Sequence, residues 1–230
     1  MKLRRLILAF ALTGLTGLTA CTAEASNTNL PDPSLDAPKT TAHSTETAVL
    51  AGGCFWGMQA VFEHVRGVRQ VWAGYSGGAA STAHYDDVSE GDTGHAESVK
   101  ITFDPAVVSY GQLLKIYFAV AHDPTELNRQ GPDAGTQYRS EIFYADAEQQ
   151  KIAQAYIAQL DAAKVFDASI VTLVQPLKAF YPAESYHQDY ARNHPDDAYI
   201  VINDAPKVAR LKQLYPALYQ PEQQVVEVTL

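Results

Sequence analysis

The amino-acid composition changes near residue 46 and divides the chain into two parts. Before it, residues 22–46 are rich in Thr, Ser, Asn, Asp, Ala and Pro and contain almost no large apolar side chains, which is typical of a disordered tether. After it, residues 47–230 mix apolar and polar side chains throughout, with no internal repeat and no second linker. That length suits one compact domain with a sizeable core, so we expect a single folded domain over residues 47–230.

The N-terminal residues have the pattern of a bacterial lipoprotein signal. Basic residues open the segment, an apolar stretch follows, and Leu-Thr-Ala directly precedes Cys21. This arrangement predicts a cleaved signal peptide over residues 1–20, lipidation of Cys21, and a tether over residues 21–46. The alternative is an uncleaved membrane-spanning helix, which is disfavoured because threonines and glycines interrupt an apolar stretch that is already short for a bilayer.

The net charge limits the classes of binding partner, and the expected lipid anchor indicates the cellular location. The chain has a formal net charge of -9, and loss of residues 1–20 would remove three basic residues and no acid. Such an acidic domain repels phosphate backbones, which argues against a nucleic-acid partner. We expect an exported lipoprotein on the periplasmic side of the cell envelope. In a Gram-negative cell we expect the outer membrane, because Thr22, rather than an aspartate, follows Cys21.

Apolar periodicity predicts alternating strands and helices. The predicted helices begin after Cys54, at Ser109 with Gln112 as a capping box, and at Asp146 through about Val165. The predicted strands are 47–51, 67–75, 97–103, 140–144 and 170–174. No Rossmann or P-loop glycine pattern accompanies them, so we expect an α+β fold, a sheet with helices packed against it.

Cys54 is the candidate nucleophile, because it is the one cysteine that can be a free thiol if Cys21 is lipidated. It lies at the predicted start of a helix, where unpaired amide hydrogens and the helix dipole favour a thiolate. Gly52 and Gly53 before it would let backbone and substrate approach closely. The alternative is an inert core cysteine, since Cys54 also falls on the apolar stripe of that helix.

Glu97 is the candidate proton donor. Strand parity puts it on the same face as Val99, Ile101 and Phe103, which points its carboxyl toward the core. A buried carboxyl is costly to ionise, so its pKa should be raised and it could donate a proton at neutral pH. The alternative is a residue at the end of the strand that reaches water past Gly94.

Tyrosines and histidines give weaker signals. Of the 13 tyrosines, Tyr85 and Tyr138 lie in polar, glycine-containing segments and could be hydroxyl donors near a pocket, although each taken singly is expected to be a half-buried packing residue with its hydroxyl in water. The seven histidines show no metal-ligand spacing, so we expect no metal site. His187 could line a pocket, but we expect it to be a hydrogen-bonded structural histidine.

Four motifs, in this order and spacing, resemble the A-type peptide methionine sulfoxide reductases: GGCFWG (52–57), GHAESV (94–99), HDPTELNRQGPDAGTQYRS (122–140) and YPAESYHQDY (181–190). The resemblance implies a ferredoxin-like β-α-β core with a mixed sheet and packed helices. It also implies reduction of methionine S-sulfoxide, free or in peptides and proteins. The site residues it implies are Cys54 as nucleophile, Glu97 as acid, Phe55 and Trp56 as the apolar wall for the substrate methyl group, and Tyr85, Asp133 and Tyr138 as a polar network.

The resemblance also implies a redox cycle. Attack by Cys54 would leave a sulfenic acid, which another thiol must reduce. Many members of the family carry further cysteines for this step, whereas residues 216–230 of this chain have none. We therefore expect no bound cofactor and an external thiol reductant such as thioredoxin. Because the chain is predicted to be exported, we expect oxidised envelope proteins as substrates. We also expect the enzyme to be a monomer.

Two other functions are compatible with a single reactive cysteine. A cysteine hydrolase or acyltransferase would need a histidine base within hydrogen-bond reach of Cys54. A lipid-anchored binding module would have Cys54 merely packed in its core, with slow alkylation.

Overall fold

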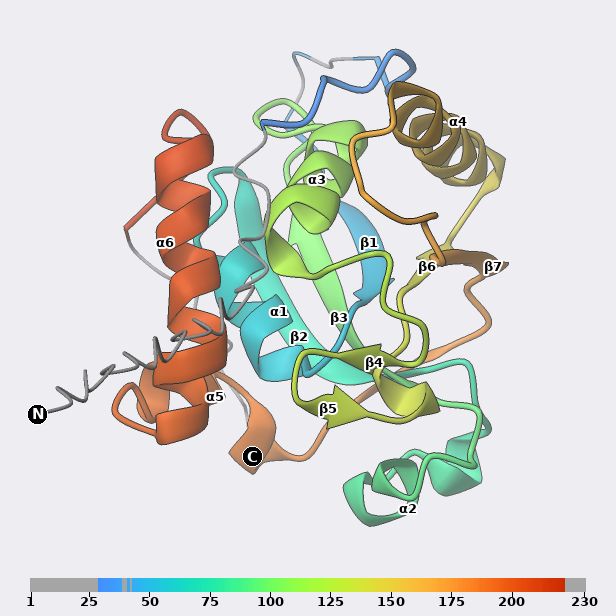
Figure 1. The fold of residues 1–230 in the computed structure, drawn as a ribbon, viewed down its shortest axis with the longest axis vertical. Helices are drawn as coiled ribbons and strands as arrows, with labels where there is room; N and C mark the ends of the chain where they lie inside the picture. The colour runs from blue at the N-terminus through green and yellow to red at the C-terminus, as the bar shows by residue number, and fades with distance from the viewer. Residues whose placement is uncertain (1–28, 39–40, 42, 222–230) are drawn as a thin grey trace, which may run out of the picture.

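The computed structural model describes residues 29–38, 41 and 43–221 as one mixed sheet with helices packed against it (Figure 1). The six strands of the main sheet lie in the order β7-β6-β1-β3-β2-β8. Their bounds, in that order, are Leu173–Pro176, Glu141–Tyr144, Glu46–Ala51, Ala96–Phe103, Val68–Ser76 and Phe180–Pro182. All neighbouring pairs are antiparallel except β6 and β7.

The helices and the remaining short elements complete the architecture. The α-helices are α1 (Phe55–Glu63), α2 (Tyr85–Ser89), α3 (Tyr110–Ile116), α4 (Ala147–Ala163), α5 (Tyr190–Asn193) and α6 (Ala205–Leu214). A small ribbon pairs β4 (Arg129–Gln130) with β5 (Asp133–Ala134). Two π-helical turns, Tyr117–Ala121 after α3 and Ile200–Asp204 before α6, are found in the described chain. No helix in these ranges is long and apolar enough to cross a membrane.

The topology confirms the α+β prediction. The order of elements β1-α1-β2-β3-α3-β6, with β6, β1, β3 and β2 adjacent in space, is the ferredoxin-like arrangement. In β1, Ala48 and Leu50 enter the main core with the helices, while Val49 and Ala51 join a smaller cluster on the other face. The central strands are therefore covered on both faces.

Local sequence signals account for the helix starts. Ser109 and Gln112 form the predicted capping box at α3, with Gln112 N donating to Ser109 Oγ at 3.2 Å and Ser109 N to Gln112 Oε1 at 3.0 Å. Asp146 accepts from Gln149 N at 2.9 Å and caps α4, also as predicted.

The strand predicted over residues 170–174 is shifted. Val171 N donates to Pro124 O at 2.8 Å, so this part of the chain bonds to the loop after α3 instead of to the sheet. Pairing with β6 begins at Leu173 and ends at Pro176. β-Branched composition indicated a strand, but only the long-range partner determined its register.

The prediction of a disordered tether over residues 21–46 is wrong for the segment 29–38. In Figure 1 this dark blue segment runs along the top of the molecule beside α3 and α4. Leu30 is buried, Lys115 Nζ donates to Asp32 Oδ1 at 2.8 Å, and Gly111 N donates to Asp36 Oδ1 at 2.8 Å. Composition could not reveal these partners, because they lie far away in the sequence. The predicted signal peptide and Cys21 are outside the described residues.

Candidate active site

Cys54 lies at the N-cap of α1, directly after the glycine pair. Gly53 has φ +88°, and a Cβ there would come within 2.5 Å of Gln130 Cγ. A Cβ at Gly52 would come within 2.8 Å of the His122 ring. Both glycines are therefore required by the tight contact between this turn and the segment behind it. Cys54 itself is 8% exposed.

The segment behind the glycines is held by hydrogen bonds that involve four residues of the third motif. Gln130 accepts from Asp123 N at 2.9 Å and donates to Asp123 O at 3.0 Å. His122 Nε2 and Ser140 Oγ are 2.7 Å apart, and Tyr117 Oη donates to Ala51 O at 2.7 Å. These contacts fix the turn that presents Cys54.

Sheet register brings Glu97 to Cys54. Ala51, at the end of β1, pairs with Ser98 near the start of antiparallel β3. The residues that follow β1 and those that begin β3 therefore lie together at one end of these two central strands. Phe55 N, the first amide of α1, donates to Glu97 Oε2 at 3.0 Å. Glu97 is 3% exposed, which confirms that it points inward and rules out the solvent-exposed alternative.

Burial controls the charge of both groups. Burial raises the pKa of Glu97 to about 8, with the Asp133 charge adding to the effect, so its carboxyl carries a proton at neutral pH. Burial also raises the pKa of the Cys54 thiol well above its ordinary value, and Glu97, once it ionises, and Asp204 act in the same direction through their negative charges. The backbone N–H of Trp56 opposes this shift but is outweighed. The expectation that the helix terminus favours a resting thiolate is therefore wrong.

An aromatic wall surrounds the thiol. Phe55 is buried, with its ring centroid 5.0 Å from that of His187. The Trp56 ring stacks on Tyr190 at 3.8 Å between centroids and meets the Tyr199 ring edge-on at 5.8 Å. Phe55 and Trp56, the two residues that the resemblance assigned to the apolar wall, thus both pack against the His187 ring.

The three polar residues implied by the resemblance lie around the same point. Tyr85, at the start of α2, and Tyr138 are half-buried, and neither hydroxyl is hydrogen-bonded to another residue in the described chain. Burial raises the pKa of both hydroxyls, and Glu97 and Cys54 also contribute to both shifts. Asp133 accepts a hydrogen bond from the Tyr199 hydroxyl instead of from either of these tyrosines.

Several residues of this site were not assigned to it from the sequence. His187 was expected to be a hydrogen-bonded structural residue, and its Nδ1 does accept from Trp56 Nε1 at 3.1 Å. Its ring also lies 4.4 Å from that of Tyr85, between ring centroids, so it belongs to the site as well. Glu184 accepts from Tyr85 N at 3.0 Å and orients the start of α2. Both belong to the fourth motif, which could have marked them. Tyr199 and Asp204 follow every motif and carried no signal.

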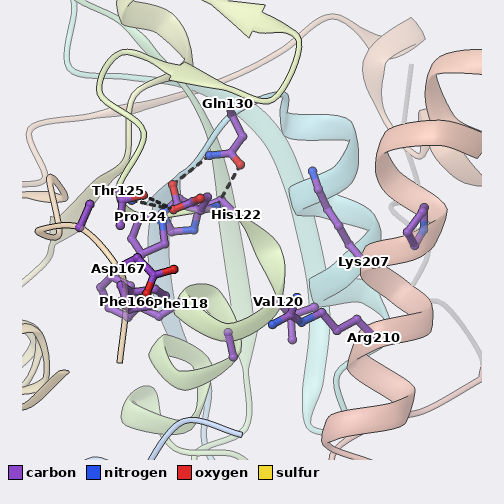
Figure 2. A pocket seen from close by; sticks show the side chains of 14 residues that line it. Phe118, Val120, His122, Pro124, Thr125, Gln130, Phe166, Asp167, Lys207 and Arg210 are labelled. Atoms are coloured by element: carbon purple, nitrogen blue, oxygen red, sulfur yellow. Dashed lines mark hydrogen bonds between the residues drawn. The ribbon is translucent and has the colours of Figure 1, made fainter. Parts of the chain in front are cut away.

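A separate cavity of about 460 Å³ lies behind the glycine turn (Figure 2). Figure 2 shows Lys207 and Arg210 reaching toward it from α6, opposite Gln130, His122 and Pro124. Neither Cys54 nor Glu97 lines it, so this cavity is distinct from the centre described above.

Comparisons with known proteins agree with the motifs. A family model described as peptide methionine sulfoxide reductase matches residues 46–218. Peptide methionine sulfoxide reductase MsrA 2 of Mesorhizobium japonicum is 61% identical over 178 residues, 77% of this chain and 91% of that protein. MsrA 2 of Synechocystis sp. is 55% identical over 188 residues, 81% of this chain and 88% of that protein.

Solved structures show the same fold. Mxr1 from Saccharomyces cerevisiae in reduced form superposes with a TM-score of 0.59 at 31% identity, covering 68% of this chain and 92% of that one. Methionine sulfoxide reductase A of Corynebacterium diphtheriae gives a TM-score of 0.57 at 35% identity, covering 66% of this chain and 76% of that one.

Proposed function

Because the chain belongs to the peptide methionine sulfoxide reductase family, in its A type, we propose that Cys54 attacks the sulfur of a bound methionine sulfoxide while Glu97 protonates the sulfoxide oxygen. The observation that carries this proposal is the buried Glu97 carboxyl, bonded to Phe55 N at 3.0 Å in the residue next to Cys54. A sulfoxide sulfur is a poor electrophile until its oxygen is protonated or strongly hydrogen-bonded. A carboxyl that keeps its proton at neutral pH can supply that proton.

The surrounding side chains orient the substrate in this proposal. Phe55 and Trp56 receive the methyl group, and the hydroxyls of Tyr85 and Tyr138 donate to the sulfoxide oxygen. Asp133 acts through Tyr199, whose hydroxyl donates to it and whose ring lies against Trp56. A site with aromatic rings for the methyl group and hydroxyl donors for the oxygen distinguishes the two epimers of the sulfoxide. We assign the S epimer as the substrate.

The reaction leaves a sulfenic acid on Cys54, the one cysteine in the described residues. We propose that an external thiol, such as that of a thioredoxin, reduces it directly. The chain would then need no bound cofactor, because the electrons come from Cys54 and afterwards from this reductant.

The proposed cellular role rests on the N-terminal sequence. Cleavage after residue 20 and lipidation of Cys21 would anchor a monomeric enzyme on the periplasmic side of the envelope, in the outer membrane of a Gram-negative cell. Its substrates would be oxidised methionines of envelope proteins.

Anaerobic single turnover of the full chain tests the chemistry. A peptide with each epimer of methionine sulfoxide is mixed with reduced protein, and methionine and Cys54 sulfenic acid are counted by mass spectrometry. We expect one methionine per Cys54 from the S epimer, with the thiol converted to sulfenic acid. Absence of methionine with Cys54 still reduced would refute the proposed chemistry.

A further inference from the structure

Asp204 is a buried carboxylate that the reaction described above does not use. It ends the π-helical turn before α6 and is fully buried. Lys207 Nζ donates to its Oδ1 at 3.1 Å, whereas its Oδ2 is buried without a hydrogen-bond partner in the described chain. An unpaired buried carboxylate oxygen is costly, so the site is expected to offer it a partner during the reaction.

The position of Asp204 is fixed against the turn that carries the nucleophile. A Cβ on Gly57 would overlap Asp204 Oδ1, so Gly57 is the residue that admits this carboxylate. Gly57 is the third residue of α1 and Cys54 is its N-cap, which places both in one helical turn. The charge of Asp204 accordingly acts on the Cys54 thiol.

The thiol needs a proton acceptor, and the other neighbours cannot serve. Cys54 holds its proton before reaction, and Glu97 already carries the proton that it donates. His187 Nδ1 accepts from Trp56 Nε1, so in the neutral ring the remaining nitrogen, Nε2, bears hydrogen and cannot accept. The tyrosine hydroxyls are poor bases. Asp133 also acts on the thiol, but less strongly than Asp204, and it already accepts from the Tyr199 hydroxyl. Asp204, whose Oδ2 has no partner in the described chain, is therefore the acceptor beside this turn.

We propose that Asp204 is the base that takes the proton from Cys54 when the thiol attacks the sulfoxide. The Sγ–H bond breaks and its proton goes to Asp204 Oδ2, while Sγ bonds to the sulfoxide sulfur and Glu97 protonates the oxygen. The hydroxyl then transfers to Sγ and the sulfur–sulfur bond breaks, so Cys54 loses the two electrons that methionine gains. The proton on Asp204 returns through solvent to Glu97.

The surrounding charges suit this role. Burial raises the pKa of Asp204, and Asp133 adds to that rise, which makes the carboxylate a stronger base than an exposed one. Lys207 opposes the shift and favours the ionised form of the carboxylate. Glu97 on the sheet, Asp133 on the β4–β5 ribbon and Lys207 on α6 are thus the ionisable groups that act on Cys54 or Asp204.

The test rests on the proposed function and uses two readouts of the full chain, measured from about pH 6 to pH 9. One is the single-turnover rate of methionine formation, and the other is the alkylation rate of Cys54, followed on its peptide by mass spectrometry. In Asp204→Asn we expect methionine formation to slow by about 100-fold. Alkylation should be at least as fast as in the wild type, because a negative charge near the thiol is gone.

Matched variants separate the possible outcomes. Asp196→Asn, which removes an exposed carboxylate from the preceding loop, should change neither rate. If methionine formation in Asp204→Asn is unchanged or faster, or if both rates fall together, Asp204 is not the base. Wild-type protein that forms no methionine would instead refute the proposed function itself.

Lys207→Met provides a second test that does not depend on folding of the Asn variant. It leaves the carboxylate in place but removes the ammonium that lowers the pKa of Asp204. The acidic limb of the single-turnover pH profile should therefore move to higher pH. An unmoved limb would overturn the assignment of Asp204.

Discussion

At the scale of single residues, the chemistry depends on desolvation. A helix N-terminus stabilises a negative charge by about 0.3–2 kcal/mol. Each pKa unit corresponds to about 1.4 kcal/mol, and full burial shifts a pKa by up to about 3–5 units. Desolvation therefore outweighs the helix terminus at Cys54, whose thiol stays protonated until substrate and a base are present. The same effect keeps Glu97 protonated.

Glu97→Gln should separate proton donation from nucleophilicity. A neutral amide cannot deliver a proton, so we expect single-turnover sulfoxide reduction to fall by about 100-fold or more. Alkylation of Cys54 should persist, because the side chains are of similar size. In the wild type, the reduction rate should decline above about pH 8, where Glu97 ionises. An unchanged rate in the variant would remove Glu97 from the mechanism.

The same residue makes a prediction about stability. The pKa of Glu97 is raised from an ordinary value of 4.5 to about 8, so the folded state binds this proton more tightly than the unfolded chain does. The free energy of unfolding should therefore fall as pH rises from about 4.5 to about 8. We expect Glu97→Gln to unfold at a higher temperature than wild type near pH 9, with the gap closing near pH 5. Thermal unfolding across this range checks the sign.

At the scale of secondary-structure elements, hydrogen bonds at the helix N-termini fix where α3 and α4 begin. The predicted caps at Ser109 and Asp146 are present because each needs only residues three positions apart. The start of α3 has a further partner, since Asp36 accepts from Gly111 N at 2.8 Å and from the Ser109 hydroxyl. A carboxylate at this position also complements the positive end of the helix.

Asp36→Ala should weaken the start of α3. Loss of a charged acceptor at a helix N-terminus costs about 1–2 kcal/mol of unfolding free energy. Urea unfolding of this variant should show that decrease with little change in single-turnover rate, because the partners of Asp36 lie at the start of α3 and include no residue of the proposed site. Asp161→Ala, at an exposed carboxylate of α4, is the matched control and should stay near wild type. Equal stability of the two variants would contradict the capping role.

At the scale of the whole molecule, the N-terminal segment 29–38 and the proposed active site lie at opposite ends of the fold. Figure 1 shows the segment 29–38 along the top, while α2, β4 and β5 lie at the bottom. Tyr85 and Asp133, which belong to α2 and β5, surround Cys54 at that lower end. Any anchor that precedes the segment would thus attach to the fold opposite the active site.

Truncation tests how far this segment belongs to the fold. Removing residues 1–38 deletes the buried Leu30, worth about 2 kcal/mol, together with the bond from Lys115 to Asp32. We expect a clearly lower unfolding temperature for this truncation than for one that removes residues 1–28 alone. Identical unfolding temperatures would show that the segment contributes no stability.

Features that depend on near neighbours or on contiguous motifs could be predicted from the sequence. These include the strand parity that buries Glu97, the caps of α3 and α4, the glycine pair before Cys54, and the family. Tertiary structure alone decided the remainder, because the partners are distant in the chain: Asp36 on α3, Val171 on Pro124, and Asp204 against Gly57. It also decided the charge of Cys54, since desolvation depends on everything packed around a group and no local pattern reports it.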